Sequence, residues 1–211
     1  MISHLFIYPI KSLGAISLQK AVVEREGLRG DRRFMLVDAQ GKFIKQRTRP
    51  ELTSFKLDES DHGFMVKDSI SGLEKELILN PTLGTWIAVE IWEDQLQAQE
   101  VLDGWSSWFS EVLKEDVKLV CISAENPREM KPKHQTDLAK NTSFADSLPL
   151  LVIGSASYQA LEDRLTGPVD RLRFRPSIIV NSTEPFVEDT WVEIKVGEVR
   201  LYGAKPCARC L

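Results

Sequence analysis

The sequence predicts a mainly β protein of the α+β class, with antiparallel strands and a few helices. Three observations support this prediction. Short segments of alternating apolar and polar residues recur through the first hundred positions, and clusters of Gly, Asp and Asn separate them. Only two segments show the helical spacing of apolar residues, and further short strands follow the second of them. A β-barrel or two packed sheets is the architecture that this pattern indicates.

The N-terminal part begins with an apolar strand and continues as hairpins. Residues 2–11 lack the basic lead and the small-residue cleavage site of a signal peptide, so we expect a strand there. The sequence Asp38-Ala-Gln-Gly41 separates two apolar runs, 33–37 and 42–45, and predicts a hairpin turn. The pattern repeats on either side of residues 58–63.

The middle of the chain combines strands with the first predicted helix. Further strands are expected at 76–79, 86–92, 95–101 and 117–122. Asp103 is the expected N-cap of the helix between the last two strands. One face of that helix carries four apolar residues, Trp105, Trp108, Phe109 and Val112.

The pattern changes after residue 122. Residues 123–147 hold two prolines and several charges without a clear period, so we expect a long loop, and loops of this length are often functional. A second helix is expected from Ser155 to Leu165, with Gly167 as its stop signal. The strands expected after it are 177–181, 192–196 and 198–202.

The composition is that of a folded soluble protein. Hydrophobic residues make up 43% and charged residues 27% of 211 positions, which is enough apolar surface to bury a core. The net charge of −4 argues against nucleic acid or an anionic membrane as a partner. No apolar stretch approaches the ~20 residues that cross a membrane. Three cysteines form no disulfide framework, so a cytoplasmic location is expected.

Four polar clusters are candidates for chemistry. They are residues 8–12, 27–33, 170–176 and 205–210. Each cluster taken alone has an ordinary structural explanation, because Lys and Arg at strand ends are commonly solvated. Asp31 can cap a turn, and Asp170 can belong to a weak surface ion-pair cluster.

The Cys207-x-x-Cys210 pair fits neither ordinary role of such a pair. A structural zinc site requires a second pair of ligands, and neither Cys121 nor the three histidines are spaced as one. A thioredoxin-like pair would begin a helix, whereas this one follows a predicted strand near the last residue. Lys205 and Arg209 favour a thiolate, which is a soft metal ligand. The arginines of the other clusters suit a phosphate-bearing ligand.

Four motifs, in this order, resemble those of the MOSC family: Tyr-Pro-Ile-Lys-Ser, Gly-Leu-Arg-Gly-Asp-Arg-Arg, Arg-Phe-Arg-Pro-Ser and Lys-Pro-Cys-Ala-Arg-Cys. The resemblance extends from about Ile2 to Leu211 and is greatest to the branch with the mitochondrial amidoxime-reducing components and their bacterial relatives. It implies an antiparallel β-barrel-like N-terminal domain over 1–120, packed on a MOSC β-barrel domain over 121–211. Family members continue past the cysteine motif. We therefore expect the second barrel to be incomplete at Leu211, so that an edge of it and part of the cofactor pocket are open.

The resemblance also implies a molybdenum cofactor, in which molybdopterin holds the metal. Cys210 matches the metal ligand of the family and is expected to be catalytic, with Cys207 as its neighbour. Asp146 matches an acidic residue beside the metal and is the second expected catalytic residue. The residues expected to bind the pterin and its phosphate are Lys11, Ser12, Arg33, Ser147, Arg175, Ser177 and Arg209. Ser177 stands where close relatives have Asn, but its hydroxyl can still form a hydrogen bond. Pyridoxal phosphate is not expected as a cofactor.

The activity that the resemblance implies is the reduction of small N-hydroxylated compounds. Asp146 would move a proton to the leaving oxygen. Electrons would come from a ferredoxin-type or cytochrome-type donor, because this chain has no iron–sulfur cysteine pattern. An alternative is a sulfur-carrier module of the molybdenum-cofactor sulfurase type, with a persulfide on Cys210 or Cys207. A third hypothesis is a β protein whose cysteines and basic residues are incidental.

Overall fold

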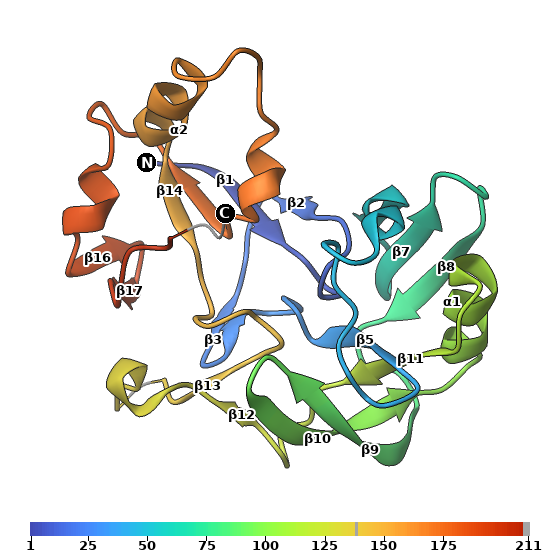
Figure 1. Ribbon diagram of the computed structural model, residues 1–211. Coiled ribbons are helices and arrows are strands. Elements are labelled where there is room, and N and C mark those ends of the chain that lie inside the picture. The colour runs from blue at the N-terminus through green and yellow to red at the C-terminus, as the bar shows by residue number, and fades with distance from the viewer. Residues whose placement is uncertain (138, 209–211) are drawn as a thin grey trace.

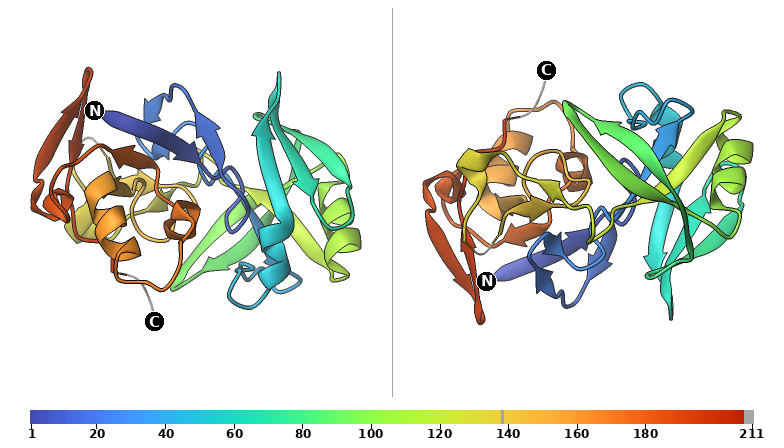
Figure 2. Two further views of the ribbon diagram at one scale, coloured as in Figure 1. Left: turned by 90° about the horizontal axis from the view of Figure 1, so that it is seen from above. Right: turned by 90° about the horizontal axis from the view of Figure 1, so that it is seen from below.

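The computed structural model describes residues 1–137 and 139–208 and has two lobes that meet near its centre. In Figure 2, the strands between residues 34 and 121 and helix α1 (Trp105–Leu113) form one lobe. The N-terminal strand lies in the other lobe, beside helix α2 (Ser155–Glu162) and the C-terminal strands (Figures 1 and 2). The two ends of the described chain therefore share one lobe.

Strands dominate both lobes, so the predicted mainly β, α+β class is confirmed. The strands are β1 (Ile2–Ile7), β2 (Ile16–Leu18), β3 (Val23–Glu24), β4 (Gly27–Leu28), β5 (Phe34–Asp38), β6 (Phe55–Glu59), β7 (Gly63–Asp68), β8 (Glu74–Ile78), β9 (Leu83–Ile91), β10 (Asp94–Val101), β11 (Val117–Cys121), β12 (Arg128–Glu129), β13 (Asn141–Thr142), β14 (Val152–Gly154), β15 (Ile178–Val180), β16 (Glu193–Val196) and β17 (Val199–Tyr202). The α-helices are α1 (Trp105–Leu113) and α2 (Ser155–Glu162). Short 3-10 helices are η1 (Pro50–Ser54), η2 (Pro132–His134), η3 (Arg171–Phe174) and η4 (Val187–Thr190).

Two four-stranded sheets organise the lobes. The order β5-β11-β10-β9 is antiparallel throughout, and β6-β7-β8 forms a separate antiparallel sheet of the same lobe. The second sheet has the order β14-β15-β1-β2, in which β14 and β15 run parallel. Within the described residues each sheet is open rather than closed on itself. Strand β1 therefore connects the start of the chain to its C-terminal strands.

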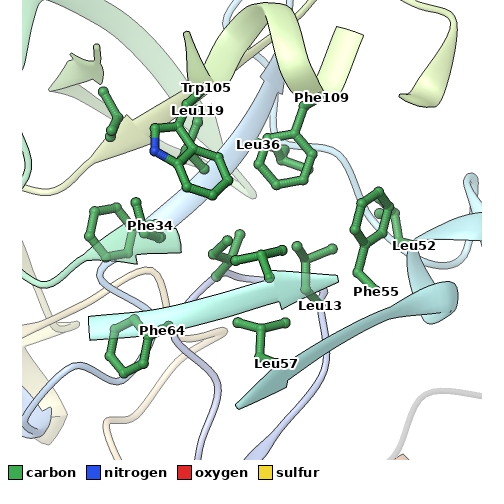
Figure 3. Close-up of a cluster of buried hydrophobic side chains, with 14 of the residues drawn as sticks. Leu13, Phe34, Leu36, Leu52, Phe55, Leu57, Phe64, Trp105, Phe109 and Leu119 are labelled. Atoms are coloured by element: carbon green, nitrogen blue, oxygen red, sulfur yellow. The ribbon is translucent and has the colours of Figure 1, made fainter. Parts of the chain in front are cut away.

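The main core lies between the sheets and α1 (Figure 3). Phe34 and Leu36 of β5 belong to this core, whereas Met35 and Val37 belong to a second apolar cluster, so alternate side chains of β5 enter different clusters. This is the period-2 alternation of a strand buried on both sides. Burial of each such large side chain stabilises the fold by roughly 1.5–3 kcal/mol.

Helix α1 packs on this core with the face that the sequence predicts. Trp105 and Phe109 are buried, while Trp108 and Val112 pack against the core and are partly exposed. The predicted N-cap is wrong. Asp103 and Gly104 both have left-handed backbone, at φ of 62° and 73°, and no side chain caps the helix. The chain turns sharply here to leave β10, so tertiary geometry overrides the capping preference.

Three other predictions need adjustment. The Asp38–Gly41 turn is present, but the arm after it forms isolated bridges such as Val37 to Phe43 rather than a full strand. Gly41 is required there, because φ is +82° and a Cβ would lie 2.2 Å from the carbonyl oxygen of Ala88. Helix α2 ends at Glu162, three residues earlier than predicted. The predicted loop 123–147 contains the short antiparallel pair β12–β13.

None of the helices in the described ranges is both long and apolar enough to span a membrane.

Candidate cofactor-binding site

Segments from four distant parts of the chain meet where the two lobes join. The residues after β1 bond to the segment before β5: Arg32 N–H donates to the Tyr8 carbonyl at 2.9 Å, and Lys11 N–H donates to the Phe34 carbonyl at 2.8 Å. Phe144 N–H donates to the Arg32 carbonyl at 3.0 Å. We call residues 8–11, 31–34, 144–146 and 175–176 the junction. Two of the predicted clusters are thus held side by side by backbone hydrogen bonds.

Lys11 and Asp146, both predicted site residues, are in direct contact in the junction. Lys11 Nζ donates to Asp146 Oδ1 at 2.5 Å and to the Phe144 carbonyl at 2.9 Å. Trp92 Nε1 donates to the same Asp146 oxygen at 3.1 Å. The side chain of Lys11 is only 7% exposed, whereas that of Asp146 is 71% exposed. A buried cation therefore holds a carboxylate that an incoming ligand can reach.

The pKa values of Lys11 and Asp146 reflect the burial of each group and their contact with each other. Burial lowers the pKa of Lys11 to about 8, although the Asp146 carboxylate opposes this change. Partial burial acts to raise the pKa of Asp146. The Lys11 ammonium, with hydrogen bonds from Lys11 and Trp92, outweighs burial and holds that pKa below its usual value. At neutral pH the pair is an ammonium beside a carboxylate.

A second cluster in the junction combines Tyr8, Asp31, Arg32 and Arg175. Asp31 is buried, accepts a hydrogen bond from Tyr8 N–H at 2.7 Å, and forms an ion pair with Arg32. The guanidinium carbon of Arg175 lies 4.1 Å from the Tyr8 ring centroid, and that of Arg32 lies 4.6 Å from it. Arg175 Nη1 donates to the Leu13 carbonyl at 2.8 Å. Burial, with Arg32 nearby, lowers the pKa of Arg175 to about 10.

The backbone is strained at this site. Among the described residues, seven other than glycine have positive φ. Arg32 and Arg175 of the junction have φ of 50° and 55°, and Ser12 and Trp92, which border it, have φ of 71° and 57°. Left-handed backbone costs about 1–2 kcal/mol for residues with a Cβ. Such strain concentrates at ligand sites and catalytic sites. The concentration here supports a functional role for the junction.

Unpartnered donors show which ligand these residues fit. Arg33 Nε and Arg175 Nη2 are buried without a hydrogen-bond partner among the described residues. A buried guanidinium N–H that lacks an acceptor is costly, and phosphate oxygens are strong acceptors for it. The Oγ1 of Thr142 and Oγ of Ser143 are also buried and unpartnered. This donor set fits an anionic, phosphate-bearing cofactor.

The remaining predicted residues lie in several places. Ser12 Oγ donates to the Ile44 carbonyl at 3.1 Å, and Ser147 Oγ accepts from Lys205 Nζ at 3.1 Å. Arg33 Nη2 donates to the Ile122 carbonyl at 3.2 Å, beside Cys121. Ser177 is fully buried, and its Oγ accepts from Leu151 N–H at 3.4 Å. These assignments stay predictions.

The cysteine motif is only partly within the described residues. Cys207 is exposed and forms no disulfide with another described residue. Cys210 and Arg209, the predicted metal ligand and its basic neighbour, lie outside the described residues. Over residues 1–137 and 139–208, no group of three His, Cys, Asp or Glu side chains could hold a metal ion.

The structure adds residues that the sequence patterns did not single out. Trp92 directly follows β9 and contacts Asp146 and Phe43, the latter with ring centroids 4.9 Å apart. Arg128 is buried, pairs with Asp94 at 2.7 Å, and donates to the carbonyls of Ser143 and Ala145. Arg128 fixes the backbone just before Asp146. An isolated arginine in a stretch of sequence without a clear period gives no signal of this role.

The fold and the junction define a class: a mainly β protein with a buried cationic site for an anionic ligand. Comparison with known families makes this more specific. A model of the MOSC N-terminal beta barrel domain matches residues 1–116, and a model of the MOSC domain matches residues 139–211. This chain belongs to the MOSC family. The division at residue 120 stays a prediction.

Two groups of named proteins match at least 99% of the chain. Mitochondrial amidoxime-reducing component 1 of Danio rerio is 29% identical over all of this chain and 67% of its own length. The protein of that name from Mus musculus is 27% identical over 64% of its length. Molybdenum cofactor sulfurase of Oryza sativa is 26% identical over 99% of this chain and 27% of its own length. The chain thus spans about two thirds of the first kind of relative and about a quarter of the second.

Among solved structures, a protein of Bordetella bronchiseptica matches 51% of this chain and 92% of its own length, with 10% identity and a TM-score of 0.39. That similarity is too slight to inform the fold or the function.

Proposed function

We propose that this chain binds a molybdenum cofactor and is part of an oxidoreductase that reduces small N-hydroxylated compounds. The observation that supports this most directly is the Lys11–Asp146 pair, 2.5 Å apart, in a junction where Arg33 Nε and Arg175 Nη2 are buried without a hydrogen-bond partner among the described residues. The name amidoxime-reducing component, carried by relatives that match the whole chain, suggests the substrate class.

The residues that would hold the cofactor are cations and donors of the junction. Arg175 and Arg33 have free N–H groups for phosphate oxygens, and Lys11 has a third N–H beyond its two hydrogen bonds. Ser12, Ser147, Ser177 and Arg209 are further proposed contacts, and Cys210 is the proposed metal ligand. When bound, the cofactor supplies the two-electron reduction that separates oxygen from nitrogen.

Proton delivery is the proposed task of the Lys11–Asp146 pair. Reduction of an N-hydroxyl group consumes two electrons and two protons, breaks the nitrogen–oxygen bond, and yields an N–H group and water. Asp146 is exposed enough to meet a substrate, but its lowered pKa leaves it ionised at neutral pH. The Lys11 ammonium has a pKa of about 8 and donates a hydrogen bond to Asp146 Oδ1. It can therefore pass a proton to the substrate through the Asp146 carboxylate.

The proposed partners follow from the electron balance. A ferredoxin-type or cytochrome-type protein would deliver the electrons, and neither nucleic acid nor a membrane is a proposed partner. A cytoplasmic location remains our prediction, although the relatives named above as amidoxime-reducing components are called mitochondrial.

The experiment is to measure molybdenum and pterin per chain in protein made in a host that synthesises the cofactor, beside Cys210→Ala. Reduction of benzamidoxime with a chemical electron donor is then assayed in both. We expect metal, pterin and activity in the parent and loss of metal or activity in the variant. Cys207→Ala is the matched control and should keep both. Absence of pterin from folded parent protein would reject the proposal.

The second candidate is a sulfur-carrier module of the molybdenum-cofactor sulfurase type. The observation in its favour is that Cys207 is exposed in a chain that is similar over 99% of its length to a molybdenum cofactor sulfurase. Mass spectrometry after incubation with a persulfide donor distinguishes the two. A persulfide on Cys207 or Cys210, with no turnover of N-hydroxylated compounds, would favour this candidate.

A further inference from the structure

The aromatic ring of Tyr8 contacts two guanidinium groups of the junction, those of Arg32 and Arg175. Only 1% of its surface is exposed, and the guanidinium carbons of Arg175 and Arg32 lie 4.1 and 4.6 Å from its ring centroid. A cation over an aromatic face is stabilised by the ring quadrupole, and more so when both are removed from water. Tyr8 therefore allows two like charges to remain close together in a buried place.

Hydrogen bonds hold Tyr8 at its backbone and at its hydroxyl group. The backbone N–H of Tyr8 donates to Asp31 Oδ1 at 2.7 Å, and its hydroxyl donates to the carbonyl of Pro176 at 3.1 Å. Pro176 follows Arg175, so the hydroxyl also anchors the backbone that carries this arginine. Arg32 Nη2 reaches the Arg175 carbonyl from the other side at 3.2 Å. Arg175 has left-handed backbone with φ of 55°, a conformation that needs such support.

The two arginines differ in how their charge is balanced. Arg32 forms an ion pair with the buried carboxylate of Asp31. Within the described part of the chain, no carboxylate lies within ion-pair distance of Arg175, and its Nη2 is buried without an acceptor. The unbalanced cation is thus Arg175, and the missing partner is an anion.

We propose that Tyr8 is a positioning residue that holds the Arg175 guanidinium so that its Nη2 hydrogens face a phosphate-type group of the bound ligand. The inference rests on the proposed function for the identity of that ligand, the phosphate-bearing cofactor. That the ligand is an anion is inferred from the junction alone, because the buried Arg175 Nη2 lacks an acceptor among the described residues. Asp31 completes the arrangement in two ways. It accepts the hydrogen bond from the Tyr8 backbone, and it neutralises the Arg32 guanidinium by an ion pair.

The test uses inorganic phosphate as the probe, because phosphate binding can be measured whether or not the cofactor is present. Phosphate affinity is measured by ³¹P NMR titration for the cofactor-free parent, Tyr8→Phe, Tyr8→Leu and Arg175→Gln. Tyr8→Leu should weaken binding about tenfold because two cation–π contacts are lost. Tyr8→Phe keeps the ring and should stay within about threefold of the parent. Arg175→Gln should remove the site.

Tyr158 provides a matched control. It is also buried, and the guanidinium carbon of Arg171 lies 4.9 Å from its ring centroid, but its hydroxyl bonds to Glu162 outside the junction. Tyr158→Leu should leave phosphate affinity unchanged even where it lowers thermal stability. This variant separates loss of positioning from general destabilisation.

A double-mutant cycle tests whether Tyr8 acts through Arg175. In an Arg175→Lys background, the effect of Tyr8→Leu on phosphate affinity should fall below about twofold, since an ammonium lacks the planar stacking and fork geometry of a guanidinium. If Tyr8→Leu does not fold, Arg175→Lys alone carries the test, and we expect at least about a fivefold loss of affinity.

Several outcomes would overturn the inference: no phosphate binding by the parent, equal affinity of parent and Tyr8→Leu, or equal affinity of parent and Arg175→Lys. Pterin content of the purified variants is measured in parallel. Tyr8-dependent phosphate binding in a protein that never contains pterin would uphold the positioning role and reject the proposed function.

Discussion

The two lobes differ in what buries their strands. In the first lobe, β5 is covered on both faces, and four consecutive residues from Phe34 to Val37 are fully buried. In the C-terminal part, β15 is buried because it lies between β14 and β1, whereas β16 and β17 alternate between half-buried and exposed residues. Of these three strands, β15 alone is buried throughout, and it is the one that pairs with the N-terminal strand β1. The junction lies where these two kinds of packing meet.

The largest expected effect is in the first lobe. Phe34→Ala removes a fully buried ring from the main core and should lower the free energy of unfolding by about 3–5 kcal/mol. Urea denaturation measures the change. Phe186→Ala is the control, because that ring is 46% exposed, and it should change the stability by no more than about 0.5 kcal/mol. Equal losses would remove the contrast between the lobes.

The next largest effect is a dependence of the free energy of unfolding on pH, caused by Lys11 in the junction. Lys11 titrates near its ordinary pKa of 10.5 in the unfolded chain and at about 8 in the fold. Between these values the unfolded state binds the extra proton, so stability should rise with pH, by about 3 kcal/mol in total. Lys11→Met should abolish this contribution.

Urea denaturation of the parent and of Lys11→Met at about pH 7.5 and about pH 10 tests this expectation. Lys118→Met is the control, since the side chain of Lys118 is 42% exposed on β11. An unchanged pH slope in Lys11→Met would mean that Lys11 is not buried as a cation.

A smaller effect is expected where strand β15 pairs with β1. Ile179 of β15 is buried and pairs with His4 of β1 and Ile153 of β14. Ile179→Val should lower the free energy of unfolding by about 1 kcal/mol. Hydrogen exchange should quicken in β1 and β15 together while β5 keeps its protection. Faster exchange in β15 alone would show that the two strands do not open as one unit.

The smallest effect is expected in the β16–β17 hairpin. Leu201→Ala removes a half-buried side chain whose strand partner is Ile194 of β16, and should change stability by about 0.5 kcal/mol. A thermal unfolding scan is sufficient to measure it. A loss as large as that of Phe34→Ala would mean that this hairpin packs on a further surface in solution.

The sequence by itself determined the class of the fold and the local elements with a clear period. The Asp38–Gly41 turn, the apolar face of α1 and the strands of the middle third were predictable, because alternation and helical spacing are local properties of the chain. It also identified the family, through four motifs in order, and with it named Lys11 and Asp146 as site residues, but it did not predict that the two are in contact.

Only the tertiary structure decided how these pieces meet. The parallel pairing of β14 with β15, the left-handed backbone at Asp103, and the stacking of Arg32 and Arg175 on Tyr8 leave no local signature. Lys11 and Asp146 are 135 residues apart, and Tyr8 and Pro176 are 168 apart. The physical reason is that burial, charge balance and strain at one point depend on every segment that packs there, whereas a local pattern reports only on its own neighbours.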